Sequence, residues 1–497
     1  MKDLMKHGWN ILSGKNEKVL LVCNAWIFPL TFTFSYLLNI AFYYLGLAST
    51  ENPARRYGFI LGSVLFAAVC LWVFFQSLRK QKISAIRWIL LGLVAVFFGL
   101  CFVMGILNTS THYVMLGNAK TFCFFAAPAF LAGIVAAVKK TEDSFFGMLE
   151  KLSFFALPAA TLYTFFALLN CNPYKATRGL GILHYMTFAY TLMPLFLALL
   201  LRFADKAELP IPFTNRHFKR PQLVRGIMIA IYWIALIATG TRGMYICVTF
   251  FCLLLVISRF IHREPAKRAC LLSLVLSALL LFNMFIYAPP GMHAVSRMSG
   301  FVQSLLNGKF NTTDTEGDDA FDLLTGTNQP SSNEQTNDSE QSDEEEDQII
   351  DYPDRPALDP DASTPPSVEN IKISNRGTLY KLTFSEFVKA PVFGMGPGGY
   401  SGKYGIYPHN AFMEILCETG LVGCLILFPL LLLALIKLCI VGWTNKNIWY
   451  IFIFMLTYVL QINISGTVWN CPALLCTLGY GLAMPLPKRE NRLKLRR

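Results

Sequence analysis

Long apolar stretches separated by short polar connections dominate the chain. Eleven stretches of at least 16 residues contain no Asp, Glu, Lys or Arg: 19–50, 57–78, 88–119, 121–138, 152–174, 179–201, 226–241, 243–258, 269–296, 419–436 and 447–487. A helix needs about 20 apolar residues to cross a bilayer, so most of these stretches predict membrane spans. The last one contains Ser465, Gly466, Asn470 and Pro472 near its middle, which predicts two helices. The pattern therefore predicts an all-α integral membrane protein with about 12 transmembrane helices.

The basic residues predict the orientation of these helices. If both termini are cytoplasmic, the inside segments carry 29 of the 43 Lys and Arg residues, and eight of the other 14 lie in one long external loop. Short cytoplasmic loops are enriched in Lys and Arg, so we expect this topology in the cell (cytoplasmic or inner) membrane. The same asymmetry explains the net charge of +12 through contact with anionic lipid, without nucleic acid. Only 15% of residues are charged, which argues against an ordinary soluble enzyme.

The spans and their connections divide the chain into four parts. We expect transmembrane helices 1 to 9 in 1–287, a long external loop in 288–408 before the third-last helix, helices 10 to 12 in 409–487, and a basic cytoplasmic tail in 488–497. No cleavable signal peptide is expected, because the first apolar stretch is longer than a signal sequence requires.

The long external loop changes in composition along its length. Between residues 311 and 369 there are 18 Asp or Glu and one basic residue, Arg355, so this tract predicts a disordered, solvated tether. Asp359 and Asp361 have a spacing that can hold a divalent metal, but so acidic a tract produces it by chance. The part from 371 to 408 is expected to be ordered, beginning with a helix that lies on the outer face and ends before Pro391.

The cysteines and the common motifs add few constraints. The 13 cysteines lie mostly in apolar segments and predict no disulfide framework, although a pairing of Cys171 with Cys471 stays open. No Cys or His cluster has zinc spacing, and no phosphate-binding loop of the Walker type occurs. We expect neither a metal nor a cofactor.

The first candidate for chemistry is the sequence Thr-Gly-Thr-Arg-Gly at 239–243. Basic clusters lie on both sides of it, so Arg242 marks the external tip of a helical hairpin, and the short arms predict a tip recessed below the membrane surface. An arginine in that place is costly unless it faces a wet cavity or an anion. Thr241 lies beside it, and Gly240 and Gly243 allow a ligand or another backbone to come close. The alternative is that Arg242 reaches the outer lipid headgroups.

The second candidate is His409, between Pro408 and Asn410. Proline stops a preceding helix, and Asn410 is a favoured N-cap for the helix that follows. His409 would then lie just before a helix N-terminus at the outer membrane boundary, where free N–H groups and the helix dipole favour an anion such as phosphate. A neutral histidine there can serve as a general base or donate a hydrogen bond. The alternative is a purely structural histidine.

The helix that follows His409 contains further candidate residues. Glu414 and Glu418 are four residues apart and share one helical face, and carboxylates that enter a membrane helix indicate function. Gly420 and Gly423 would permit close helix packing.

The third candidate is Arg376, in the ordered part of the external loop. The segment 393–400, FGMGPGGY, contains the G-x-G-x-x-G spacing of dinucleotide-binding proteins. It follows a proline on the external side rather than a strand, so we interpret it as a tight turn that directs the chain toward His409.

These motifs resemble those of the O-antigen ligase and polysaccharide polymerase superfamily of bacterial multi-pass membrane proteins. His409-Asn410, nine residues and then Gly420-Leu-Val-Gly423 fits its pattern H-[NSQ]-x9-G-x-x-G. The arginine of TGTRG, the long late loop, the arginine in the ordered part of that loop and the segment PVFGMGPG agree with it. The resemblance covers roughly 220–440, and the acidic insertion before Arg376 departs from the usual pattern of the family.

The resemblance implies a glycosyltransferase that moves a glycan from undecaprenyl diphosphate to an acceptor hydroxyl on the external face, without a metal and with inversion. Arg242 and Arg376 would then bind the leaving diphosphate and His409 would activate the acceptor or bind the same phosphates. The remaining candidate substrate-binding residues are Thr241, Asn410, Glu414, Gly420 and Gly423.

Several functional alternatives stay open. A polymerase would use a second lipid-linked glycan as its acceptor, and a ligase would use another envelope molecule; we favour the polymerase slightly. Polysaccharide-assembly proteins are conceivable partners in either case. The rival hypothesis is a transporter or flippase of lipid-linked oligosaccharide, which predicts charges near the membrane midplane and two similar halves. The notable charges cluster instead at external helix ends.

Overall fold

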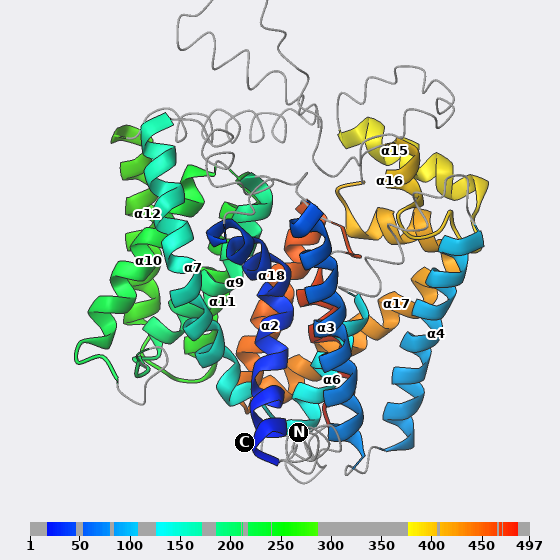
Figure 1. Cartoon of the computed structure of the whole chain (residues 1–497), viewed down its shortest axis with the longest axis horizontal. Helices are drawn as coiled ribbons and strands as arrows, with labels where there is room; N and C mark the ends of the chain where they lie inside the picture. Colours follow the sequence, from blue (N-terminus) through cyan, green and yellow to red (C-terminus); the bar gives the residue numbers. More distant parts are fainter. Residues whose placement is uncertain are drawn as a thin grey trace, which may run out of the picture.

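The computed structural model describes twelve portions of the chain: residues 17–45, 53–79, 84–107, 126–170, 185–209, 211, 217–239, 241–286, 376–404, 408–464, 467–469 and 471–485. These portions contain helices and no strand (Figure 1). The helices are α2 (Glu17–Tyr44), α3 (Pro53–Leu78), α4 (Ala85–Leu107), α6 (Ala127–Lys139), α7 (Glu142–Asn170), α9 (Tyr185–Ala204), α10 (Pro221–Ala238), α11 (Arg242–Ile261), α12 (Lys267–Ile286), α15 (Arg376–Lys389), α16 (Gly399–Tyr404), α17 (Ala411–Gly442), α18 (Lys446–Ile464) and α19 (Pro472–Ala483).

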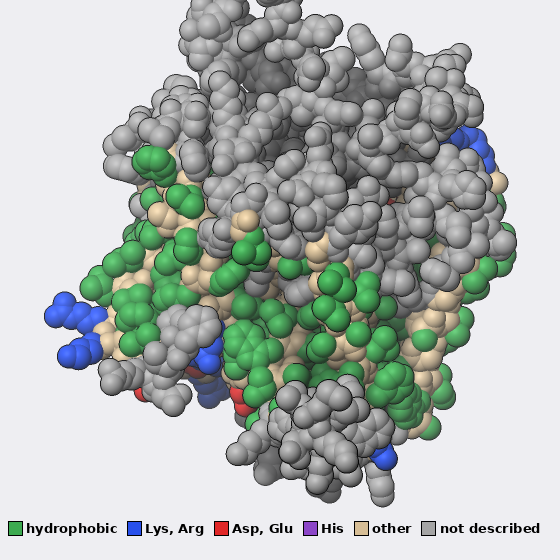
Figure 2. Space-filling model, in the orientation of Figure 1, with side chains coloured by type: hydrophobic (Ala, Val, Ile, Leu, Met, Phe, Trp, Pro, Cys, Tyr) green, Lys and Arg blue, Asp and Glu red, His purple; other side chains and the backbone are tan. Residues whose placement is uncertain are grey.

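Each of the apolar stretches that predict spans contains a helix. The 41-residue stretch 447–487 is divided between α18 and α19, as its polar centre predicts. Six helices in the described portions are long and apolar enough to cross a membrane, and further apolar helices are shorter. The helical fold and the multi-pass character are thus confirmed. In Figure 2, hydrophobic side chains cover much of the described surface, as expected for a surface that faces acyl chains.

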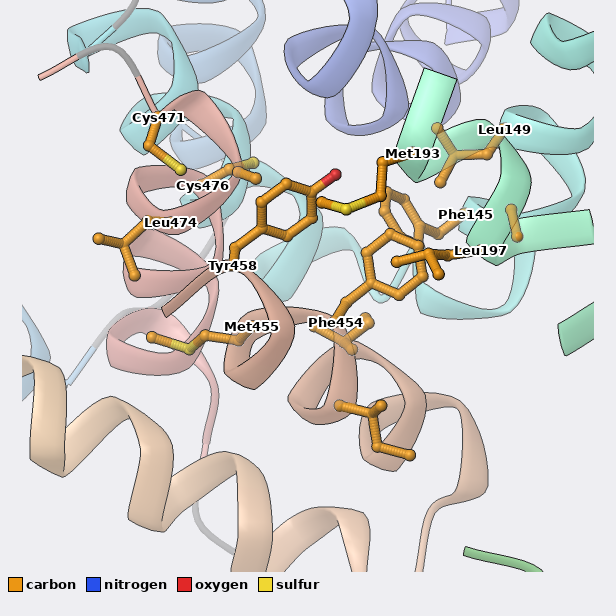
Figure 3. Packing of buried hydrophobic residues seen from close by; sticks show 14 of the residues in the cluster. Phe145, Leu149, Met193, Leu197, Phe454, Met455, Tyr458, Cys471, Leu474 and Cys476 are labelled. Atoms are coloured by element: carbon orange, nitrogen blue, oxygen red, sulfur yellow. The ribbon is translucent and has the colours of Figure 1, made fainter. Parts of the chain in front are cut away.

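The centre of the bundle is filled by aromatic, aliphatic and sulfur-containing side chains. Figure 3 shows side chains of α7, α9, α18 and α19 converging there, among them Phe145 and Phe454. The rings of these two phenylalanines meet edge to face with centroids 5.9 Å apart. Helices α6 and α19 approach so closely that a Cβ on Gly133 would clash with the backbone of Cys476. Small residues allow such close packing between membrane helices.

Ion pairs stabilise one end of the bundle, which we call the charged end. Helices α9 and α11 finish there, and helices α10 and α18 begin there. The guanidinium of Arg225 lies 2.5 Å from the carboxylate of Glu150, and both side chains are fully buried. Arg202 contacts the other oxygen of the same carboxylate at 3.3 Å. A second network joins four charged side chains from α9, α11 and α18 and the turns beside them: Asp205, Arg259, Glu264 and Lys446.

The opposite end, at which α11 and α17 begin and α18 ends, carries the candidate site; we refer to it as the site end. A Cβ on Gly243, in the first turn of α11, would meet the side chain of Ile464, the last residue of α18. Four residues later, the N–H of Val468 donates to the carboxylate of Glu414 in the first turn of α17 at 2.7 Å. The end of α18 therefore brings the starts of α11 and α17 to the same end of the molecule.

Candidate active site

The start of α17 has the capped structure predicted for it. The side-chain oxygen of Asn410 accepts hydrogen bonds from the N–H groups of Phe412 at 3.0 Å and Met413 at 3.1 Å. These bonds satisfy two of the N–H groups that a helix leaves free at its N-terminus. The predicted N-cap is thereby confirmed, and the half-buried His409 lies directly before it.

The backbone of His409 adopts an uncommon conformation. Its φ angle is +54°, in the left-handed region that L-residues other than Gly, Asn and Asp seldom occupy. Such a conformation costs about 1 kcal/mol or more and persists only where neighbouring structure enforces it. Here the buried Pro408 lies on one side and the Asn410 cap on the other. Lys140, Lys206 and Arg263 share this conformation just after helix ends, so the proposed role of His409 rests on its place before the capped start of α17.

The hairpin tip that precedes α11 is tightly packed. Thr241 is the buried N-cap of α11, and its hydroxyl oxygen lies 3.0 Å from that of Thr239. Arg242 is the first helical residue, and only its backbone is described, while Gly240 lies outside the described residues. A Cβ on Gly243 would clash with the hydroxyl of Tyr190 on α9. The close neighbours of this glycine are therefore side chains, and not the ligand or backbone that the sequence suggested.

Helix α15 begins at Arg376, of which the backbone is likewise described, and confirms the helix predicted before Pro391. The carboxylate of Glu386 anchors it to α16 through Lys403 at 2.9 Å and Tyr404 at 2.8 Å, and it also binds Lys389 at 2.5 Å. Burial alone would raise the pKa of Glu386, but these hydrogen bonds outweigh it and lower the pKa to about 2. The carboxylate therefore stays ionised at neutral pH, and the tether between α15 and α16 stays intact.

Helix α17 is broken at Gly420, in the motif that was expected only to permit helix packing. Gly420 has φ +62° and ψ −163°, and the chain resumes as a helix on the other side of it. In an intact helix, the N–H of Leu421 would donate to the carbonyl of Cys417, and that of Val422 to the carbonyl of Glu418. Neither partner is used in this way, so the break releases two N–H and two C=O groups inside an apolar helix.

The glycine-rich segment 391–400 satisfies all four released groups. Two of its N–H groups donate to α17 carbonyls and two of its carbonyls accept from α17 amides: Met395 to Cys417 at 3.0 Å, Gly396 to Glu418 at 2.8 Å, Leu421 to Pro391 at 2.9 Å, and Val422 to Val392 at 3.1 Å. Groups left without partners in an apolar surrounding would each cost several kcal/mol. We refer to segment 391–400 together with residues 417–422 of α17 as the clasp.

Two glycines make the clasp sterically feasible. Gly394 has φ +69°, and a Cβ on it would clash with the backbone of Glu418. A Cβ on Gly420 would clash with the carbonyl of Val392. The tight turn predicted for segment 393–400 is therefore present, and its described contacts are with residues 417–422 of α17 rather than with His409.

The carboxylate of Glu418 holds the clasp from inside. It is almost fully buried and accepts hydrogen bonds from the N–H groups of Gly398 at 2.8 Å and Tyr400 at 3.3 Å. The indole N–H of Trp469, in the connection between α18 and α19, donates to it at 2.5 Å. Three separate parts of the chain thus meet at one carboxylate. Its burial identifies Glu418 as a positioning group, and sequence reasoning had not given it this role.

The remaining candidates have positional roles in the described structure. Glu414 is buried and holds the backbone of Val468, as described above. A Cβ on Gly423 would clash with the side chain of Thr419 and come within 3.2 Å of the Phe97 ring on α4. The acidic tract with Asp359 and Asp361 lies outside the described residues, as does Cys171 of the suggested cysteine pair.

Taken together, the three residues expected to carry the chemistry each stand at a helix start. Arg242 opens α11, Arg376 opens α15, and His409 directly precedes the N-cap of α17. Helices α11 and α17 begin at the site end, and the clasp ties α15 and α16 to α17 (Figure 1). A helix N-terminus favours an anion such as phosphate, so each of these three places, taken singly, is suited to a phosphate group.

Comparison with known families finds a match over part of the chain. Residues 227–428 match the family model described as O-Antigen ligase. The matched region extends from α10 to the second half of α17 and contains Arg242, Arg376, His409 and the clasp. No curated protein and no solved structure matches the chain.

Proposed function

We propose, from the membership of residues 227–428 in the O-antigen ligase family, that the protein is a lipid-linked glycan polymerase or ligase. It transfers a glycan from undecaprenyl diphosphate to the hydroxyl group of an acceptor glycan at the external face of the cell membrane. The observation that carries the proposal is His409, held at φ +54° before the capped start of α17. The starts of α11 and α15, with Arg242 and Arg376, also lie within the residues that match the family model.

The proposed reaction assigns a step to each of these residues. An oxygen of the acceptor attacks the anomeric carbon of the donor, and the bond from that carbon to the diphosphate breaks. His409 accepts the proton of the attacking hydroxyl. Arg242 and Arg376 bind the leaving diphosphate, because guanidinium groups pair bidentately with phosphate oxygens and offset the developing negative charge. Attack opposite the leaving group inverts the anomeric centre. Asn410 and Thr241 shape the site through their caps, and Glu414, Gly420 and Gly423 through packing.

The topology that accompanies this reaction is also a proposal. Both termini lie in the cytoplasm, and the site end faces outside. This topology has nine spans in 1–287, an external loop in 288–408 and three spans in 409–487. The charged end supports this orientation, because Arg263 lies in the turn between α11 and α12 and Lys446 begins α18 at that end.

A transporter or flippase of lipid-linked oligosaccharide is the second candidate. The break in α17 favours it, because many transporters bind substrates at broken membrane helices. The groups released by this break are bonded to the clasp, however, and are therefore already occupied. The enzyme is the better supported of the two.

Purified protein in detergent, supplied with an undecaprenyl-diphosphate oligosaccharide, tests the proposal. His409→Ala should lower glycan transfer by about 10²- to 10⁴-fold, the usual contribution of a general base. His217→Ala is the matched control, because His217 lies outside the family region with its side chain 51% exposed, and it should leave transfer unchanged. Arg242→Lys should also transfer poorly, because an ammonium group does not replace a bidentate guanidinium.

The products distinguish the remaining alternatives. A ladder of multiples identifies a polymerase, and a single transfer to an added acceptor identifies a ligase. Transfer should persist in EDTA, and loss of transfer in EDTA would point to a metal and thus to Asp359 and Asp361. Full activity of His409→Ala would contradict the proposed active site. Absence of transfer by folded wild-type protein would favour the transporter.

A further inference from the structure

Helix α15 points two large apolar side chains outward and buries two polar ones, which is the reverse of a helix on a water-soluble protein. The side chains that face the protein include Thr383, 1% exposed, and Glu386, 5% exposed. Its outward face carries Phe384, 52% exposed, and Val388, 58% exposed. Leu379 is also buried, and Lys381, Ser385 and Lys389 are also exposed. In water, such a helix would bury the phenylalanine and expose the carboxylate. The outward face of α15 is therefore not suited to water.

The reversal is fixed by specific contacts. Glu386 is held on the inner side by Lys403 and Tyr404 of α16, as described above. On the same side, the hydroxyl of Tyr400 donates to the carbonyl of Leu379 at 3.4 Å, and Leu379 is itself buried. Rotating α15 to hide Phe384 would break all of these contacts, so its apolar face must point outward.

The outward apolar face continues onto the surface of a membrane-spanning helix. Val392 is 50% exposed and Phe393 47% exposed, directly after α15. The carbonyl of Val392 accepts a hydrogen bond from α17, and on α17 the neighbouring Leu421 and Leu425 are 49% and 73% exposed. Helix α17 is a candidate membrane span, so its exposed leucines face acyl chains. The apolar face of α15 and the lipid-facing side of α17 form one surface.

Length and charge indicate how α15 meets the bilayer. At 14 residues and about 1.5 Å per residue it is about 21 Å long, too short to cross the membrane. Two exposed lysines, Lys381 and Lys389, lie along the helix near its apolar stripe. Lysines in this position extend to the headgroups while their stems lie over apolar surface, and they attract anionic lipid phosphates.

We propose that the outward face of α15, with Val392 and Phe393, docks into the lipid bilayer beside α17. Phe384, Val388 and Phe393 contact acyl chains, Lys381 contacts phospholipid headgroups, and Lys389 keeps its pair with Glu386. This interfacial docking keeps the start of α15 near the depth of lipid phosphate groups. The proposal rests on the membrane location and on the exposed side chains of α15, and it does not depend on the glycan-transfer reaction.

Site-specific photo-crosslinking of the full chain in phospholipid nanodiscs tests this docking. The photoreactive residue p-benzoylphenylalanine replaces Phe384 in one variant and Phe393 in another, which are exchanges of one exposed aromatic side chain for another. The control variant carries it at Glu208, whose side chain is 83% exposed at the charged end of the bundle. After irradiation, mass spectrometry measures phospholipid adducts, and thermal melting confirms that each variant is folded.

We expect phospholipid adducts at 384 and 393 to exceed those at 208 by about tenfold, because only an inserted apolar face meets acyl chains. Similar yields at the three positions would overturn the docking. Crosslinks from 384 or 393 to another part of the same chain, in place of lipid, would also overturn it, because protein would then cover the face. No glycan donor is present, so failure here leaves the proposed reaction untouched, and failure of glycan transfer leaves the docking untouched.

Discussion

The two ends of the helical bundle are stabilised by different means. At the charged end, arginine and lysine side chains pair with carboxylates, as in the fully buried pair of Arg225 and Glu150. At the site end, the described bonds of the clasp join backbone groups to one another and to the carboxylate of Glu418. Backbone bonds fix the position of a chain segment within tenths of an ångström, while long charged side chains can adapt. We infer that the charged end mainly stabilises the fold, and that the site end mainly fixes the positions of the active-site residues.

Disruption of the clasp is the most direct test of this difference between the two ends. Gly420→Ala adds a Cβ that clashes with the carbonyl of Val392 and forces an alanine into φ +62°. The segment 391–400 must then move away from α17, and a displacement of about 1 Å at an active site can cost about 10²-fold in rate. We expect at least that loss in the glycan-transfer assay, with the helical content measured by circular dichroism preserved.

A glycine without such constraints provides the control. Gly92 lies in α4, and a Cβ on it would meet nothing within 4 Å. Gly92→Ala should leave transfer unchanged and slightly favour the helix, because glycine is the poorer helix former by about 1 kcal/mol. Equal activity of Gly420→Ala and Gly92→Ala would show that the clasp does not position the site.

The sequence predicted the helices well because long apolar runs are sufficient to specify membrane spans. It also predicted the Asn410 cap, which depends on the nearest neighbours in the chain, and the helix after Arg376. It did not predict the break in α17, because residues 411–442 form one mostly apolar run. The break depends on a partner segment about 25 residues earlier, and only the folded structure brings the two together.

The roles of Glu414 and Glu418 at the site end were likewise only partly predictable. The spacing of Glu414 and Glu418 indicates two carboxylates on one helical face, and it suggested contact with substrate. The donors to Glu418 come from 398–400 and from Trp469, which are separated from it by about 20 and 50 residues in the chain. Such contacts leave no periodic signal in a single sequence.

A smaller effect is expected from the carboxylate that holds the clasp. Glu418→Gln keeps the size of the side chain but replaces one acceptor oxygen with an NH2 group, so part of the bonding from Gly398, Tyr400 and Trp469 is lost. A buried donor that loses its acceptor costs about 1–3 kcal/mol, and about 1.4 kcal/mol corresponds to tenfold in rate. We expect a loss of about tenfold in kcat per folded molecule, with a smaller change in the KM for the lipid-linked donor.

The control for this variant is Glu208→Gln, because the Glu208 side chain is 83% exposed at the charged end. It should behave as wild type. A Glu418→Gln protein with lower thermal stability but unchanged kcat per folded molecule would assign Glu418 to stability alone.

The smallest effect on turnover is expected at the charged end, where the effect on stability should be considerable. Arg225→Met leaves the buried carboxylate of Glu150 with one partner, Arg202, at 3.3 Å. Removing one member of a buried ion pair costs about 3–5 kcal/mol, and the remaining arginine should keep the loss near the lower value. The double variant Arg225→Met with Glu150→Met should recover much of the stability, because packed apolar side chains often replace a buried pair without loss. Turnover per folded molecule should equal that of wild type in both variants, since Arg225 lies one helix length away from the start of α11. A fall in turnover that matches Glu418→Gln would show that the two ends are coupled, and the division between stability and precision would then be wrong.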